Sequence, residues 1–318
     1  MDLKRVLVCG ATGFIGRNLV ERLAARADLE VHAVNFSRPP FALDGVTWHR
    51  ADLRDAAAVN ELVRGMDIVI QAAATTSGAG DIVGKPYIHV TDNAVMNSLL
   101  LRACFDARVG HFVFFSCSVM YQPRVEAWRE EEWSAADEMH LNYFGVGWTK
   151  VYVEKMCEFF SRLGATKHTV IRHTNVYGPY DKFDLARSHI FGATVTKAMT
   201  SRNGILSVWG TGEEARDLIH VDDLVGFVEL ALERQRTPYE MVHVSSGRAM
   251  TVNQIVSEVI AASGRSLQIV HDEAGPSIRT SFALDNRYAR AAFGWSPTVA
   301  FPDGVRRTID WWLRSNAQ

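Results

Sequence analysis

A glycine-rich turn near the N-terminus constrains the fold of this chain more than any other stretch of its sequence. Gly10, Gly13 and Gly16 follow an apolar run, residues 6–9, and precede an amphipathic segment, residues 18–23. This order predicts a strand, a tight turn and a helix. Gly10 would permit the turn, Gly13 the close approach of a phosphate group, and Gly16 the packing of the helix on the strand. Backbone N–H groups at the positive end of that helix would bind a pyrophosphate.

Apolar, strand-like runs alternate with segments of helical periodicity through about residue 175. The expected strands cover residues 5–9, 30–35, 47–50, 68–71, 111–115 and 168–172, and the expected helices cover residues 14–27, 56–63, 93–108 and 147–163. This alternation predicts an α/β fold of the Rossmann type, a doubly wound parallel sheet with helices on both faces. Right-handed crossovers would place ligands at the carboxyl ends of the strands.

The alternation becomes irregular after Tyr177-Gly178-Pro179. Helices are expected over residues 188–200, 222–233, 252–262 and 303–314, and short strands over residues 206–209, 217–220 and 241–245. We therefore expect an NAD(P)-binding domain over residues 1–176 and a smaller, mainly substrate-binding α/β domain over residues 177–318. Some later segments are expected to return to the first domain.

Composition limits the partners and the compartment. The formal net charge is −2, so no basic surface indicates nucleic acid, and charged residues interrupt every apolar run before it reaches membrane-spanning length. The first residues run directly into the first strand, without the pattern of a signal peptide. The four cysteines are widely spaced and the histidines lack metal-ligand spacing, so neither a disulfide framework nor a metal site is expected. These features favour the cytoplasm.

The turn predicts a dinucleotide cofactor, and the residues around it are the first candidates for its site. Those expected to contact the cofactor there are Gly10, Thr12, Gly13, Phe14, Ile15 and Gly16. An acid at the end of the second strand would bind the adenosine ribose and repel a 2′-phosphate. Asn35 stands there instead and Arg38 follows, which favours NADP over NAD because guanidinium pairs with phosphate. Alternatively, Arg38 is simply a loop residue.

Two further segments are expected at the cofactor. Asp52 and Leu53, at the end of the third strand, fit an adenine contact. The small residues Ala72, Ala73 and Ala74 follow the fourth strand and would let the cofactor lie against the backbone.

Taken together, these motifs and others resemble the extended short-chain dehydrogenase/reductase family, specifically its nucleotide-sugar epimerases, dehydratases and reductases. The further carriers are Asn93 before a helix, residues 114–121, Thr149-Lys150-x-x-x-Glu154, residues 172–179, residues 208–212 and residues 216–223. The resemblance implies cofactor contacts from Asn93, Lys150 and His173. It also implies a homodimer that packs the helices of residues 93–108 and 147–163 into a four-helix bundle.

Within the family, residues 175–184 followed by Ser188-His189 look most like GDP-fucose synthase relatives. Those enzymes act on a GDP-linked 4-keto sugar and use a histidine after such a serine as an acid, and His189 matches it. The alternative is that His189 is a polar residue at the start of a helix. The resemblance further implies that Asn175, Trp209, Arg216 and Arg279 surround the nucleotide diphosphate.

The catalytic residues depart from the family pattern. The family pairs a tyrosine base with a lysine four residues later, and Lys150 matches the lysine, but Val146 stands in the tyrosine position and cannot accept a proton. The nearest upstream tyrosine is Tyr143, seven residues before Lys150, which a continuous helix would place on the same face. The family serine position holds Cys117, or Ser118 if the loop is one residue shorter.

We interpret this departure in three ways. Another residue, such as Tyr143, Cys117 or His189, supplies the acid and base; or the reaction is a proton abstraction beside an existing ketone; or the protein binds its ligands but barely turns them over. The leading prediction is an NAD(P)-dependent enzyme that epimerises or reduces a nucleotide diphospho-sugar at a 4-keto or 4-hydroxy carbon. The alternatives are a catalytically weak cofactor-binding scaffold or sensor, and a reductase of a non-sugar carbonyl compound.

Overall fold

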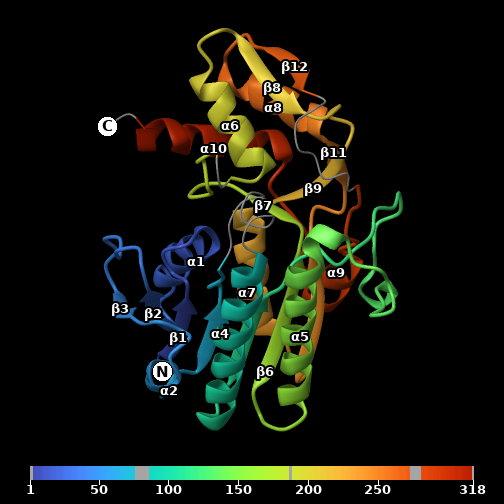
Figure 1. The fold of residues 1–318 in the computed structure, drawn as a ribbon. Coiled ribbons are helices and arrows are strands. Elements are labelled where there is room, and N and C mark those ends of the chain that lie inside the picture. The colour runs from blue at the N-terminus through green and yellow to red at the C-terminus, as the bar shows by residue number, and fades with distance from the viewer. Residues whose placement is uncertain (1–2, 76–85, 186–187, 273–280, 317–318) are drawn as a thin grey trace.

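The lower part of the molecule, as drawn in Figure 1, is built on a seven-stranded parallel sheet. The structure is a computed structural model that describes residues 3–75, 86–185, 188–272 and 281–316. Its strands are β1 (Lys4–Cys9), β2 (Leu29–Asn35), β3 (Val46–Arg50), β4 (Ile68–Gln71), β5 (His111–Phe115), β6 (Lys167–His173) and β10 (Tyr239–Val244). Their order is β10-β6-β5-β4-β1-β2-β3. From the neighbouring strands β1 and β4, the chain builds the sheet outward in opposite directions, so the switch point of the fold lies between these two strands. Ligands bind at such a switch point in doubly wound folds.

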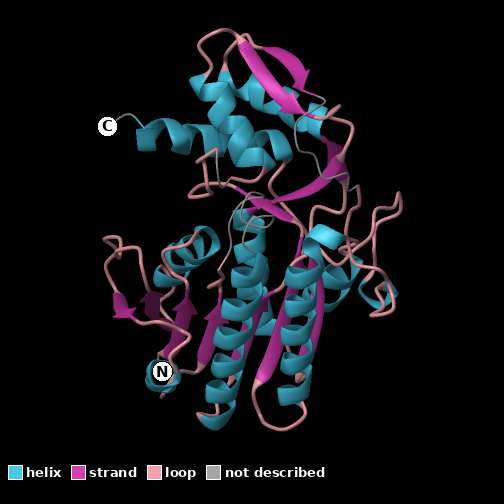
Figure 2. Cartoon of the chain, viewed as in Figure 1, coloured by secondary structure: helices cyan, strands magenta, loops and turns pink. Residues whose placement is uncertain are grey.

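Helices cover both faces of this sheet (Figure 2). One face carries α1 (Phe14–Ala24), α7 (Val221–Arg234) and α9 (Arg287–Phe293), and the other carries α2 (Ala56–Leu62), α4 (Pro86–Asp106) and α5 (Phe144–Ser161). Successive residues of β1 serve the two faces in turn: Val6 and Val8 enter the first core, and Leu7 and Cys9 enter the second. Burial on both faces explains why the strands are almost continuously apolar.

A smaller region lies beyond the carboxyl end of β6 (Figure 1). The chain enters it through β7 (Asn175–Tyr177), which follows β6 almost directly. There β7 pairs with β9 (Ala215–His220), which pairs with β11 (Ala249–Thr251), while β8 (Ile205–Trp209) pairs with β12 (Gln268–Asp272). The helices of this region are α6 (Ile190–Thr200), α8 (Val252–Ser263) and α10 (Phe301–Asn316). Their apolar faces enclose a third core around Phe191, Val256 and Ile309.

The predicted fold class is confirmed, with differences at the ends of elements. The helix expected from residue 93 begins at Pro86, where proline fits because the first turn of a helix leaves its N–H groups unpaired. The helix expected from residue 147 begins at Phe144. The strand expected over residues 241–245 is β10, which lies beside β6 in the large sheet. Within the described ranges, no helix combines the length and the apolarity that crossing a bilayer requires.

Candidate active site

The glycine turn has the geometry of a phosphate cradle. Gly10 has a φ of +72°, and a Cβ added to it would lie 2.6 Å from the Cα of Ala73. The backbone carbonyl of Gly10 likewise leaves no room for a Cβ on Gly16, so the helix begins tightly against the turn. Gly13 is the N-cap of α1 and provides no side-chain capping bond. The first N–H groups of α1 are therefore left for a ligand, as a pyrophosphate requires.

The predicted adenosine contacts lie beside this turn, and several of them also bond within the protein. The Asn35 side chain donates to the backbone oxygen of Arg38 (2.9 Å), and Arg38 donates to the backbone oxygen of Thr12 (3.4 Å). Arg38 is thus held at the edge of the cradle. Asp52 accepts from the backbone N–H and the guanidinium of Arg54, and the Leu53 side chain is buried in the core.

The segment after β4 closes the other side of the cradle. The backbone of Ala72 and Ala73 approaches Gly10, and Ala74 continues the same segment. Asn93, from α4, accepts from the backbone N–H of Thr75 (3.0 Å) and donates to its carbonyl oxygen (3.0 Å). The carboxamide of Asn93 therefore fixes the backbone after β4.

Lys150 reaches the carboxyl end of β5. Its Nζ donates to the carbonyl oxygen of Phe115 (2.7 Å), and burial lowers the pKa of this lysine. The Nδ1 of His173 lies 2.8 Å from the carbonyl oxygen of Thr174, so Nδ1 carries the proton. Burial lowers the pKa of His173 to about 4, which keeps the ring neutral at pH 7. Burial also raises the pKa of Cys117, and the nearby Lys150 cation opposes that rise.

A cleft at the carboxyl ends of the strands brings four of the predicted residues together: Ser118, Tyr143, Asn175 and Arg216. Tyr143 and Lys150 do not lie on one continuous helix. Tyr143 ends the short 3-10 helix η2 (Leu141–Tyr143) and precedes α5 with φ −106° and ψ 0°. This break in the helix places its ring at the cleft. Burial raises the pKa of Tyr143, and the positive charge of Arg216 opposes that rise.

The other predicted substrate residues are placed differently. Trp209 is exposed on β8, with its ring centroid 5.1 Å from the Nζ of Lys197, and it is not among the described residues that line the cleft. His189 is the N-cap of α6, without a side-chain capping bond, and it also does not contribute to that lining. Arg279 lies outside the described residues.

Sequence reasoning did not anticipate the buried network behind the cleft. Arg172 donates to Glu154 (Nε to Oε1, 2.9 Å) and to the hydroxyl of Tyr121 (2.7 Å), and both charged side chains are almost fully buried. Ser116 donates to the same carboxylate (2.5 Å). The network thus joins the segment directly after β5, in which Cys117 lies, to the helix that carries Lys150. The sequence did hold a signal for this network: the opposite charges of Glu154 and Arg172 both lie within motifs that resemble the family.

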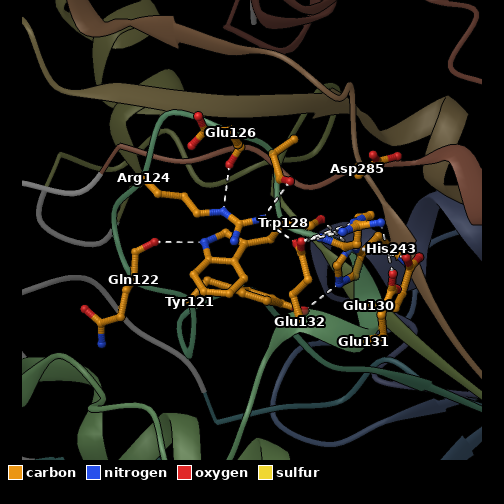
Figure 3. A network of polar contacts seen from close by, with 12 residues as sticks. Tyr121, Gln122, Arg124, Glu126, Trp128, Glu130, Glu131, Glu132, His243 and Asp285 are labelled. Atoms are coloured by element: carbon orange, nitrogen blue, oxygen red, sulfur yellow. Dashed lines mark hydrogen bonds and ion pairs between the residues drawn. The ribbon is translucent and has the colours of Figure 1, made fainter.

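The network continues into the segment between β5 and α5 (Figure 3). The Tyr121 hydroxyl lies 2.5 Å from the Nε2 of His243, whose backbone N–H donates to Glu130 (2.8 Å). Trp128 donates through its indole N–H to the carbonyl oxygen of Gln122 (2.9 Å). These bonds fix the chain on one wall of the cleft.

Known proteins resemble this chain along nearly its whole length. It is 27% identical to GDP-L-fucose synthase from Azorhizobium caulinodans, over 98% of this chain and 97% of that protein. It is 28% identical to dTDP-4-dehydro-6-deoxy-D-allose reductase from a Streptomyces species, over 97% and 96% of the two chains. The solved structure of UDP-glucose 4-epimerase from Thermus thermophilus in complex with NAD is 25% identical, with a TM-score of 0.81 over 97% of this chain and 98% of that one.

The fold is shared still more closely with UDP-glucose 4-epimerase from Thermotoga maritima, solved with UDP-glucose. The TM-score is 0.87 at 24% identity, over 98% of this chain and 99% of that one. Residues 6–245 match the model of the NAD dependent epimerase/dehydratase family. The chain therefore belongs to this family of extended short-chain dehydrogenases/reductases and is one of its NAD(P)-dependent nucleotide-sugar epimerase, dehydratase and reductase enzymes.

Proposed function

We propose that this enzyme epimerises or reduces, or both, the sugar of a nucleotide diphospho-sugar at a 4-keto or 4-hydroxy carbon. The observation that carries the proposal is the cleft in which Ser118, Tyr143, Asn175 and Arg216 meet. Arg216 supplies a cation for the diphosphate, and a guanidinium binds phosphate oxygens in pairs. The name of the dTDP-4-dehydro-6-deoxy-D-allose reductase relative supports a 4-keto carbon.

Tyr143 is the acid/base group that we propose in place of the tyrosine missing at position 146. Its phenol lines the cleft, where burial raises its pKa and the positive charge of Arg216 opposes that rise. Ser118 lies in the same cleft and would hold the reacting oxygen. Cys117 and His189 are the competing candidates. Burial raises the pKa of Cys117 as it does that of Tyr143, but neither Cys117 nor His189 is among the described residues that line the cleft.

The proposed cofactor fits the chain's own residues. Gly10, Gly13 and the first turn of α1 would hold the pyrophosphate, and Lys150 and His173 lie near the carboxyl end of β5. When bound, the nicotinamide would exchange a hydride with the sugar carbon.

NADP is the preferred cofactor in this proposal, because Arg38 is held beside the cradle and no acid stands at the end of β2. Arg38→Ala should weaken NADP binding more than tenfold in calorimetry and leave NAD binding nearly unchanged. Equal losses for both cofactors would contradict the preference.

A homodimer through α4 and α5 is also proposed. Val95 and Tyr152 are exposed on these helices, and with Ala94, Ser98 and Leu99 they line a shallow groove. Light scattering should give twice the 35.5 kDa chain mass. Val95→Arg should give the monomer, whereas Val125→Arg, at a position 95% exposed on another segment, should not. A monomeric wild type would contradict the dimer.

Turnover tests the function directly. The wild type should convert a nucleotide-linked 4-keto sugar, and Tyr143→Phe should lower kcat by roughly 10²-fold or more, as expected for loss of an acid/base group. Tyr87→Phe, on the exposed side of α4, is the matched control and should keep full activity.

Val146 also favours a second candidate function, a sensor that binds without turnover. A wild type that binds without turning over, together with a Val146→Tyr variant that gains activity, would establish the sensor instead.

A further inference from the structure

His140 is a histidine in the cleft to which neither the motifs nor the proposed chemistry give a role. It lies directly before η2, in the segment that leads from β5 to α5, and it lines the same cleft as Tyr143 and Arg216. Its ring centroid is 5.6 Å from that of Tyr143, with the two rings tilted. The side chain therefore stands beside the proposed acid/base group and is half-buried rather than solvated.

The backbone fixes which nitrogen of the His140 ring carries a proton. His140 is the N-cap of η2, and its Nδ1 accepts the backbone N–H of Asn142 (3.3 Å). An accepting Nδ1 has no proton, so the neutral ring carries its proton on Nε2. Among the described residues, Nε2 has no hydrogen-bond partner. The chain thus presents a ring N–H donor with a fixed tautomer at the cleft.

The cleft around this donor is matched to a ligand rich in acceptors. Arg216 carries only donors, and Asn175 and Ser118 can both donate from their side chains. Phosphate oxygens and sugar carbonyl or hydroxyl oxygens all accept such bonds. A ligand that presented only donors would leave the Nε2–H of His140 without a partner, which is costly once water is excluded.

We propose that His140 is a substrate-binding residue that donates its Nε2–H to an oxygen of the nucleotide diphospho-sugar. This inference rests on the proposed function, because it takes the nucleotide sugar as the ligand of the cleft. The two roles of the ring divide between its nitrogens: Nδ1 holds the backbone at the start of η2, and Nε2 binds the ligand.

The division of roles makes His140→Asn a sharp test. Asparagine is a good N-cap, so its Oδ1 can still accept the N–H of Asn142, but its shorter side chain does not reach the position of Nε2. We expect an unchanged melting temperature and a roughly tenfold loss of affinity for the nucleotide sugar, the usual effect of losing one hydrogen bond to a charged or strongly polar group. His271→Asn, on the exposed strand β12, controls for the substitution itself and should bind normally.

Calorimetry would be run with GDP-mannose, UDP-glucose and dTDP-glucose, and with GDP, UDP and dTDP alone. A loss that extends to the nucleoside diphosphate assigns the bond to a phosphate oxygen, and a loss confined to the sugar nucleotide assigns it to the sugar. Wild-type affinity in His140→Asn for a ligand that the wild type binds would overturn the role of His140 and leave the proposed function intact. A wild type that binds its cofactor but none of these ligands would overturn both.

Discussion

Gly10→Ala tests whether the cradle depends on the absence of a single methyl group. Gly10 has a φ of +72°, where a side chain costs about 1–2 kcal/mol. The new Cβ would also lie 2.6 Å and 2.7 Å from the Cα and N of Ala73 and 2.9 Å from the carbonyl carbon of Ala72. These are backbone atoms of the segment after β4, so they cannot rotate away. Overpacking of this kind adds about 1–3 kcal/mol.

The matched control is Gly204→Ala. Gly204 has the same φ of +72°, and nothing lies within 4 Å of its added Cβ, so this variant carries the conformational cost without the clash. In urea unfolding followed by circular dichroism, Gly204→Ala should lose about 1–2 kcal/mol and Gly10→Ala about 2–5 kcal/mol. Calorimetry should show at least tenfold weaker NADP binding for Gly10→Ala alone. Equal stability and equal NADP affinity in the two variants would refute the cradle.

Two further predictions concern buried charges. Glu154→Gln removes the counter-charge of the buried Arg172 and should lower the free energy of unfolding by about 3–5 kcal/mol in urea. Glu158→Gln, in a more exposed pair with Lys155, should lower it by under about 1 kcal/mol. Similar losses in both variants would contradict the importance of burial. Burial raises the pKa of Asp181 to about 7, so between pH 4 and 7 the folded state binds more protons than the unfolded state and stability falls as the pH rises. Asp181→Asn should therefore lose less stability than the wild type between pH 5 and pH 8, and parallel profiles would argue against this titration.

The sequence predicts best where a local pattern and the global fold impose the same requirement. The turn at Gly10 shows this: its position between an apolar strand and an amphipathic helix requires a positive φ and close packing, and the structure has both. The parallel sheet was predictable because burial on two faces leaves continuous apolar runs. In contrast, no local signal places β10 beside β6, because its pairing joins residues about 70 positions apart.

The cleft was harder to predict because its residues are positioned by breaks in regular structure. Tyr143 lies seven residues before Lys150, and the two would share a face only on a continuous helix. The chain instead forms η2 first, with His140 as its N-cap, and α5 begins only at Phe144. His140 carries no motif, and its value as a donor follows only from a backbone contact and a neighbouring cleft.

This placement changes which cation governs the proposed acid/base group. A tyrosine at position 146 would lie one helical turn before Lys150, whose ammonium would lower its pKa. Burial raises the pKa of Tyr143 and Arg216 is the cation that opposes that rise; its guanidinium stays charged throughout the accessible pH range. If Arg216 also binds the diphosphate, as we propose, two negative groups compete for one guanidinium. A bound diphosphate would then weaken the support for the phenolate and favour the protonated tyrosine. The occupied site would thus hold Tyr143 as an acid, ready to protonate a sugar oxygen, which agrees better with reduction or epimerisation of a ketone than with oxidation of an alcohol.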